Sequence, residues 1–318
     1  MKPFAFVFPG QGSQSVGMLD AWGDHAVVAH TLKEASDALG EDLASLIKNG
    51  PKEALALTTN TQPVMLVAAI AAYRVWMAEV GVAPVVVAGH SLGEYTALVA
   101  AGALTLSQAV PLVRLRAQAM QDAVPVGQGA MAAVLGLDAV KITTICQTIT
   151  AEYAAKGSSE SVQSANYNDP GQTVISGSKA AVDSACEQVK AAGAKRALIL
   201  PVSAPFHSTL MLPAAVKLQE ALQSVALASP QIPVLNNIDV SVQTDANAIK
   251  DALYRQAFGP VRWVETVLAM KLRGISHIVE CGPGKVLAGM VKRIDAELTG
   301  AALFDPASLV EVKALLQN

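Results

Sequence analysis

The stretch from Val85 to Ala100, VVVAGHSLGEYTALVA, decides the fold. It begins with a β-branched run typical of a buried strand, continues with the pattern G-x-S-x-G, and ends in residues that favour a helix. The two glycines allow a sharp turn between strand and helix, with the hydroxyl of Ser91 exposed at its apex and a helix N-terminus behind it. A serine in such a nucleophile elbow can attack an acyl carbon. A plain Gly-Ser turn is the alternative, since the motif alone occurs by chance in about one chain of this length in ten. The strand and helix on either side favour the elbow.

Other strand-like runs alternate with long helical patterns, which is typical of a mostly parallel sheet covered on both faces. With the run before the elbow, these strands are Phe4–Phe8, Val85–Ala88, Ile232–Leu235 and His277–Cys281. Together they predict an α/β fold whose large domain, residues 1–125 and 203–318, is α/β-hydrolase-like.

Residues 126–202 have a different order, strand-helix-strand-strand-helix-strand. The predicted elements are Ala130–Leu135, Asp138–Ala155, Val162–Tyr167, Gln172–Ser176, Lys179–Ala192 and Arg196–Leu200. The turn sequence Asn168-Asp169-Pro170-Gly171 joins the two central strands. This order predicts a ferredoxin-like small domain inserted in the larger one, with Pro125 and Gly127 near one border and Pro201 near the other. Ligands would bind in the cleft between the two domains.

Composition argues against several classes of function. Apolar residues make up 52% of the 318 residues, but no apolar run approaches the ~20 residues that span a bilayer. A net charge of −3 gives no general attraction to nucleic acid or to a membrane surface. The three cysteines form no C-x-x-C pair, which favours reduced thiols over disulfides or a metal site. The apolar start, Phe4–Phe8, is too short for a signal peptide, so we expect a cytoplasmic protein.

Two glycine-rich loops resemble nucleotide-binding loops only in part. Gly10–Ser15 lacks the last glycine of G-x-G-x-x-G, and Gly282–Lys285 is not followed by the serine or threonine of a P-loop. We therefore expect no bound nucleotide. The first loop follows a strand and should lie beside the elbow, where its backbone N–H groups and that of Leu92 could stabilise an oxyanion.

A serine nucleophile needs a base, and the chain has five histidines. Four of them have plain explanations as surface or structural residues: His25, His30, His90 and His277. The ring of His90 should face away from Ser91, because adjacent positions at a strand end point to opposite sides. His207 remains, in a proline-containing loop where the chain crosses the cleft, and it is the expected base. No aspartate stands out as a third member, so a Ser-His dyad oriented by a backbone carbonyl and a triad both remain open.

One arginine lies on the apolar face of a predicted helix. Thr105 and Gln108 form a capping box, and the helix should run to about Asp122. Arg116 falls within its apolar stripe, whereas Arg114 shares a polar face with glutamines. A buried guanidinium needs an anionic partner, and its fork of donors matches a carboxylate. Either an internal carboxylate or a substrate that ends in one could be that partner.

With these features in place, the sequence resembles the malonyl-CoA:acyl carrier protein transacylases of bacterial type II fatty acid synthesis. Seven motifs in the same order carry the resemblance across nearly the whole chain. They are FVFPGQGSQ (Phe6–Gln14), TQP (Thr61–Pro63), GHSLGEY (Gly89–Tyr95), RLRAQAMQ (Arg114–Gln121), NYNDPGQ (Asn166–Gln172), SAPFHS (Ser203–Ser208) and ECGPGKVL (Glu280–Leu287).

The resemblance implies a reaction and a role for each matching residue. Ser91 would be the acylated nucleophile and His207 its base. The backbone N–H groups of Gln11 and Leu92 would form the oxyanion hole, and a carbonyl of Gln256 would orient the histidine. Malonyl-CoA would be the donor and the phosphopantetheine thiol of acyl carrier protein the acceptor.

Specificity is also implied by the resemblance. Arg116 would clamp the malonyl carboxylate, and Phe206 corresponds to a position where a smaller side chain admits a branched acyl group in related polyketide enzymes. Met120, one turn beyond Arg116, is expected to line the same substrate site. We expect a monomer that uses no cofactor or metal and binds neither nucleic acid nor membrane.

Other functions are compatible with parts of this pattern. A discrete acyltransferase of a polyketide or malonate decarboxylase system would share the chemistry. A serine esterase would share the elbow but would need an acid on the histidine. A non-catalytic scaffold would be expected to have lost Ser91 or His207, and both are present.

Overall fold

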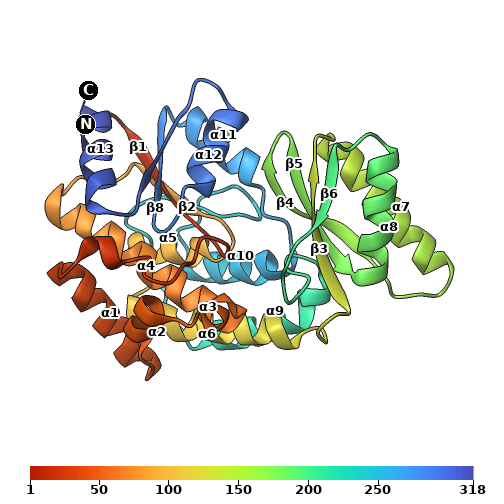
Figure 1. Ribbon diagram of the computed structural model, residues 1–318, viewed down its shortest axis with the longest axis horizontal. Helices are drawn as coiled ribbons and strands as arrows, with labels where there is room; N and C mark the ends of the chain where they lie inside the picture. The colour runs from red at the N-terminus through yellow and green to blue at the C-terminus, as the bar shows by residue number, and fades with distance from the viewer. Residues whose placement is uncertain (318) are drawn as a thin grey trace.

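The larger of two sheets is built around β1 (Phe4–Phe8), in which all five residues are buried. The computed structural model, which describes residues 1–317, gives this sheet the strand order β7-β2-β1-β8-β9 (Figure 1). Its other strands are β2 (Val86–Gly89), β7 (Val234–Leu235), β8 (His277–Cys281) and β9 (Thr299–Leu303). Every pairing in it is parallel, which confirms a mixed α/β fold with a parallel sheet.

The alternation of side chains along β1 explains why helices cover both faces of this sheet. Phe4, Phe6 and Phe8 point to one face and join the main core. There the ring of Phe6 meets that of Trp76 in α4 (Thr58–Glu79) edge-on, with 5.5 Å between the ring centroids. Ala5 and Val7 point to the other face and pack in a second core with residues of α11 (Trp263–Leu272) and α12 (Val286–Ile294). A strand that is apolar at every position is therefore buried on both sides, as parallel sheets require.

Helices on the two faces of this sheet lie in separate layers (Figure 1). Those outside the small sheet are α1 (Ala26–Leu39), α2 (Leu43–Asn49), α3 (Lys52–Ala56), α4 (Thr58–Glu79), α5 (Gly93–Ala100), α6 (Leu106–Asp122), α9 (Leu212–Gln223), α10 (Ala246–Phe258), α11 (Trp263–Leu272), α12 (Val286–Ile294) and α13 (Pro306–Gln317), with short 3-10 turns η1 (Asp20–Trp22) and η2 (Thr209–Met211). The predicted capping box of α6 is confirmed.

Among the helices of residues 1–317, none combines the length and the apolar character that a membrane span needs.

The second sheet contains four antiparallel strands and lies at one end of the molecule (Figure 1). Its elements are β3 (Gly129–Leu135), α7 (Ala139–Ala155), β4 (Val162–Asp169), β5 (Gln172–Ser178), α8 (Lys179–Ala191) and β6 (Arg196–Ile199), with strand order β4-β5-β3-β6. Helices α7 and α8 cover one face through a core of their own. Met131 and Ala133 on the opposite face join the main core, so the small sheet packs directly against the rest of the protein.

Some predicted boundaries were wrong. The strand predicted from Ile232 begins only at Val234, and Pro233, which has no N–H, contributes a carbonyl that accepts from Val87 N at 2.9 Å. The hairpin turn is tighter than predicted, since β4 runs on to Asp169 and leaves only two residues in the turn. Strand β9 was missed, because its small residues give no strand pattern; Gly300 lies so close to α12 that a Cβ there would sit 2.4 Å from a backbone oxygen.

Candidate active site

The turn between β2 and α5 is as sharp as the glycine spacing predicts. Ser91 has a φ of +53°, in the left-handed region that residues with side chains rarely adopt. A Cβ on Gly89 would lie 1.8 Å from the backbone of Gly93, and one on Gly93 would lie 2.1 Å from the carbonyl oxygen of Phe8. Only glycine fits these two positions, and the resulting turn presents Ser91 beyond the end of the sheet.

The hydroxyl of Ser91 meets the imidazole of His207, 116 positions away in the sequence. Ser91 Oγ lies 2.7 Å from His207 Nε2. On the other side of the ring, Nδ1 lies 3.0 Å from the backbone carbonyl oxygen of Gln256 and 3.1 Å from that of Gly259, both at the C-terminal end of α10. Carbonyls only accept, so Nδ1 carries the proton and Nε2 is free to accept the proton of Ser91. Within residues 1–317 no carboxylate bonds to this ring, and the arrangement is a dyad oriented by carbonyls.

Burial keeps His207 neutral. Its side chain is almost fully enclosed, and desolvation together with the nearby Arg116 cation lowers its pKa to about 3. The pKa falls because both a dry environment and a neighbouring guanidinium disfavour a second proton on the ring. His207 is therefore in its basic form throughout the neutral pH range.

Arg116 lies in the same cluster, fully buried, as its place in the apolar stripe predicts. Its Nη1 donates to Gln62 Oε1 at 2.6 Å, and its Nη2 donates to Gln256 Oε1 and to Ser91 Oγ, both at 3.1 Å. The ring of Tyr95 lies under the guanidinium, 5.3 Å from its central carbon. All of these partners are neutral. In the described part of the chain no carboxylate pairs with Arg116, so the internal partner that the sequence left open is not found.

The sequence predicts an oxyanion hole from the backbone N–H groups of Leu92 and Gln11, which follow the neighbouring strands β2 and β1. Leu92 immediately precedes α5, and Gln11 lies in the loop after β1, the neighbour of β2 in the sheet. Over residues 1–317 neither N–H donates to a protein acceptor. The side chain of Gln11 is tied to this region, because its Oε1 accepts from Gln62 Nε2 at 3.1 Å.

The remaining predicted site residues lie at the edge of the cluster. Met120 is buried, and its sulfur is 3.9 Å from Gln62 Nε2. Phe206 precedes His207 and packs in the main core. His90 bonds to Asn168 at 2.9 Å and takes no part in the dyad, as expected.

A cavity of about 240 Å³ lies between the loop after β1 and the small sheet. Its wall includes Gln11, His90, Asn166, Asn168 and Gln172. The sequence predicts a ligand in the cleft between the two domains. This cavity reaches His90, the residue before Ser91, but Ser91, His207 and Arg116 are not part of its wall.

Sequence reasoning missed three buried polar residues in this cluster, Gln62, Glu94 and Asn237. Glu94 Oε2 accepts from Gln256 Nε2 at 2.9 Å and from the N–H of Asn237 at 2.8 Å. Desolvation raises the pKa of Glu94 to about 7. A signal for Glu94 was present, since it is the one charged residue of the buried helix α5. Gln62 lies within the motif TQP (Thr61–Pro63), which marks its position but not its contact with Arg116. Asn237 gave no signal, because a neutral side chain outside any motif carries no pattern of its own.

Comparisons with known proteins agree with this geometry. Residues 5–300 match the family described as acyl transferase domain. The malonyl CoA-acyl carrier protein transacylase of Escherichia coli K12 is 51% identical over 310 residues, which cover 97% of this chain and 98% of the relative.

Solved structures give the same result. The acyl-carrier-protein S-malonyltransferase of Burkholderia pseudomallei 1710b is 60% identical with a TM-score of 0.94, covering 98% of this chain and 99% of the other. A structure described as a type II PKS acyl-carrier protein in complex with its malonyl-transacylase matches at 48% identity and a TM-score of 0.94, covering 100% of both chains. The chain therefore belongs to the acyl transferase domain family, and it matches malonyl CoA-acyl carrier protein transacylases over nearly its whole length.

Proposed function

We propose that this protein moves a malonyl group from malonyl-CoA to the phosphopantetheine thiol of acyl carrier protein, in fatty acid biosynthesis. The observation that carries the proposal is that the hydroxyl of Ser91 lies within hydrogen-bond distance of both a neutral imidazole and a buried guanidinium. The relatives named for malonyl transfer, and the related transacylase in complex with a carrier protein, support the same donor and acceptor.

The first half of the reaction acylates the enzyme. His207 Nε2 takes the proton of Ser91 as Oγ attacks the thioester carbonyl of malonyl-CoA. The negative charge that forms on the carbonyl oxygen is stabilised by the N–H groups of Gln11 and Leu92. The tetrahedral intermediate then collapses, the carbon–sulfur bond breaks, and CoA leaves as a thiol with the proton from His207. The product is a malonyl ester on Ser91.

The second half reverses these steps with a different thiol. The phosphopantetheine thiol of the carrier protein gives its proton to His207 and attacks the malonyl ester. Collapse of this second intermediate returns the proton to Ser91 Oγ and releases malonyl-carrier protein. Because the ring shuttles one proton in each direction, it must be neutral at the start of both halves, and the carbonyls of Gln256 and Gly259 hold it in the tautomer that this requires.

Arg116 gives this reaction its preference for a dicarboxylic acyl group. A buried cation held only by neutral groups has unused attraction for an anion, and the fork of a guanidinium binds a carboxylate with two parallel hydrogen bonds. A malonyl group attached to Ser91 would place its free carboxylate near Nη2, which already reaches Ser91 Oγ. The carboxylate would then replace part of the contacts with Gln62 and Gln256.

The proposal includes the finer architecture. The large part, residues 1–125 and 203–318, acts as an α/β-hydrolase-like catalytic domain, and residues 126–202 as a ferredoxin-like domain that closes over the site. The enzyme acts as a cytoplasmic monomer. It needs neither metal nor organic cofactor, since Ser91, His207 and two N–H groups account for every proton and charge in the steps above.

A panel of acyl donors tests the proposed function. The purified protein is mixed with acyl carrier protein bearing phosphopantetheine and with malonyl-, methylmalonyl-, succinyl- or acetyl-CoA, and the mass of the intact carrier is followed. We expect rapid malonylation and much slower transfer of acetyl. Release of free malonate without carrier acylation would instead indicate an esterase.

The size of Phe206 should control whether a branched acyl group enters. Phe206 is mostly buried, next to the base, and replacing it by leucine or alanine removes bulk where the branch of a methylmalonyl group would lie. One methyl group is worth about 10- to 200-fold in discrimination. We expect Phe206→Ala to raise the ratio of methylmalonyl to malonyl transfer at least about tenfold, with Phe206→Leu in between, measured with the two donors in competition. An unchanged ratio in both variants would show that Phe206 does not limit acyl size.

The low pKa of His207 predicts an unusual pH profile. A histidine with an ordinary pKa near 6.5 would lose about tenfold in kcat/KM by pH 5.5, whereas a pKa of about 3 predicts no such loss. Malonyl-pantetheine is the substrate of choice, because it lacks the titrating phosphates of CoA. Glu94→Gln serves as the background, since Glu94 itself has a pKa of about 7. We expect kcat/KM of this variant to stay constant from pH 5 to 7.5. A loss of kcat/KM below a pKa near 6.5 would contradict a neutral buried His207.

A further inference from the structure

One buried amide bridges the two ends of the turn that carries Ser91. Asn237 lies just beyond β7, next to β2 in the sheet, and its side chain is completely buried. Its Oδ1 accepts a hydrogen bond from the backbone N–H of Ser91 at 2.7 Å. Its Nδ2 donates to the carbonyl oxygen of Gly89, also at 2.7 Å. The amide therefore satisfies one donor and one acceptor on either side of the strained residue.

The two hydrogen bonds of Asn237 lie on either side of a residue with a strained backbone conformation. Ser91 has a positive φ, which is a conformation of higher energy for a residue with a side chain, and it persists only where its surroundings enforce it. We propose that Asn237 is a positioning residue that fixes the turn so that Ser91 Oγ faces His207. This inference rests on the proposed function, because it assigns a role in that same acylation step.

A second contact links Asn237 to the base. Glu94 Oε2 accepts from the backbone N–H of Asn237 at 2.8 Å and from Gln256 Nε2 at 2.9 Å. Gln256 Nε2 also donates to the backbone carbonyl oxygen of Ser91 at 3.0 Å. The backbone carbonyl oxygen of Gln256 accepts a hydrogen bond from His207 Nδ1. One buried carboxylate thus joins the residue that holds the nucleophile to the residue that orients the base.

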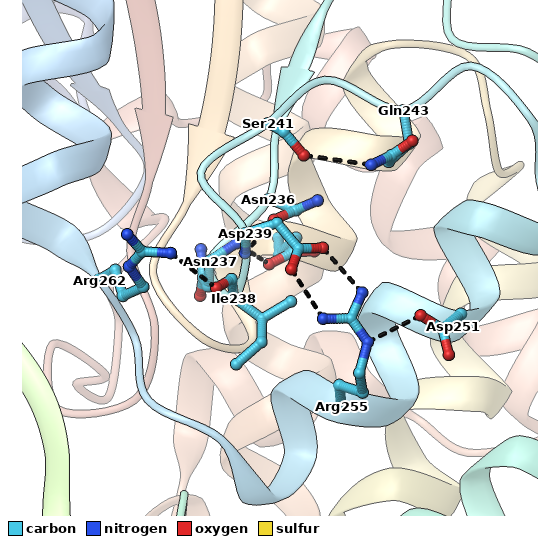
Figure 2. Close-up of polar contacts among 10 residues, drawn as sticks. Asn236, Asn237, Ile238, Asp239, Ser241, Gln243, Asp251, Arg255 and Arg262 are labelled. Atoms are coloured by element: carbon cyan, nitrogen blue, oxygen red, sulfur yellow. Dashed lines mark hydrogen bonds and ion pairs between the residues drawn. The ribbon is translucent and has the colours of Figure 1, made fainter.

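The loop that carries Asn237 is itself firmly anchored (Figure 2). The carboxylate of Asp239 accepts hydrogen bonds from Nη1 and Nη2 of Arg255, both at 2.7 Å. Arg255 Nε donates to Asp251, also at 2.7 Å. Val240, in the same loop, has a φ of +56°, which is strained for a β-branched residue and shows that tertiary contacts dictate its path.

Inside the loop, a neighbouring amide has a purely local role. Asn236 Oδ1 accepts from the N–H of Asp239 at 2.7 Å, and the N–H of Asn236 donates to the carbonyl of Ser241 at 3.1 Å. Asn236 is also buried, but no hydrogen bond joins it to Ser91, His207 or Gln256 within residues 1–317. Asn236 is therefore a matched control, since it has the same side chain and stabilises the same loop.

The test compares Asn237→Ala with Asn236→Ala in single-turnover acylation of Ser91 by malonyl-CoA, with KM and the melting temperature measured alongside. For Asn237→Ala we expect the acylation rate to fall about 10²-fold, the loss typical of a reacting atom displaced by about 1 Å, while KM stays within about threefold. Asn236→Ala should lower the melting temperature but keep the acylation rate of the folded protein within about threefold. If Asn237→Ala does not fold, Asn237→Asp takes its place; it keeps the acceptor for Ser91 N–H, loses the donor to Gly89, and should lose about tenfold.

The outcomes separate this inference from the proposed function. Acylation of the folded Asn237 variant at the wild-type rate, or equal losses of rate in both alanine variants, would overturn the positioning role while leaving the malonyl transfer intact. Absence of acylation in the wild-type protein would overturn the proposed function and this inference with it. A rate loss confined to Asn237 at constant KM supports both.

Discussion

Replacing His207 by alanine is expected to slow acylation of Ser91 by about 10²- to 10⁴-fold, the usual contribution of general acid–base catalysis. Without the imidazole, no hydrogen-bond partner of Ser91 Oγ in residues 1–317 can accept its proton, because the other partner, Arg116, only donates. The measurement is the rate at which the malonyl adduct forms under single-turnover conditions. KM for malonyl-CoA should change little, since His207 acts on the nucleophile and not on the CoA portion.

Ser91→Ala provides the blank for this experiment. It should form no adduct at all, which defines the rate that non-specific acylation contributes. His207→Ala lies in a buried position, so its circular dichroism and melting temperature are compared with those of Phe206→Ala, a neighbouring truncation of similar burial. A folded His207→Ala protein that acylates as fast as the wild type would show that another group accepts the proton.

Replacing Arg116 by alanine is expected to change the choice of substrate more than any other single substitution. A buried charge–carboxylate interaction is worth about 3 to 5 kcal/mol when one partner is removed, which corresponds to about 10²- to 10³-fold or more in rate. We expect kcat/KM for malonyl transfer to fall by about that factor, and acetyl transfer, which offers no carboxylate, to change by less than about tenfold. The measurement is the ratio of the two rates in each variant.

Arg116→Lys is the matched control, because it keeps the charge and loses the fork of donors. It should recover only part of the malonyl preference, since an ammonium cannot form the two parallel hydrogen bonds. The pH profile gives a second readout, because the guanidinium is one cause of the low pKa of His207. In Arg116→Ala that pKa should rise, so that an acid limb in kcat/KM moves toward neutral pH. Equal losses of malonyl and acetyl transfer would show that Arg116 does not bind the carboxylate.

Local patterns predicted the parts of this protein that depend on nearby residues. The elbow could be predicted because the strand, the two glycines and the helix are contiguous in sequence. The buried position of Arg116 followed from the 3.6-residue period of α6. His207 could be singled out because histidine is rare in the chain and its other copies have local explanations, although nothing local specified the 2.7 Å contact with Ser91.

What could not be predicted depends on contacts between distant segments. Asn237 reaches Ser91 across 146 positions, and Gln62 reaches Arg116 across 54. An amide is neutral and has no periodic pattern, so its role is visible only when the chain is folded. Strand β9 was missed for a related reason: its small residues are selected by close packing against α12 and not by strand propensity.

The most direct test of the account is the mass of the peptide that contains Ser91. The protein is incubated with malonyl-CoA in the absence of any carrier protein, quenched in acid, digested and analysed by mass spectrometry. The account predicts one malonyl group on the Ser91 peptide, lost when carrier protein bearing phosphopantetheine is added before the quench. An unmodified Ser91 peptide from a preparation that still transfers malonyl to the carrier would contradict a covalent serine intermediate.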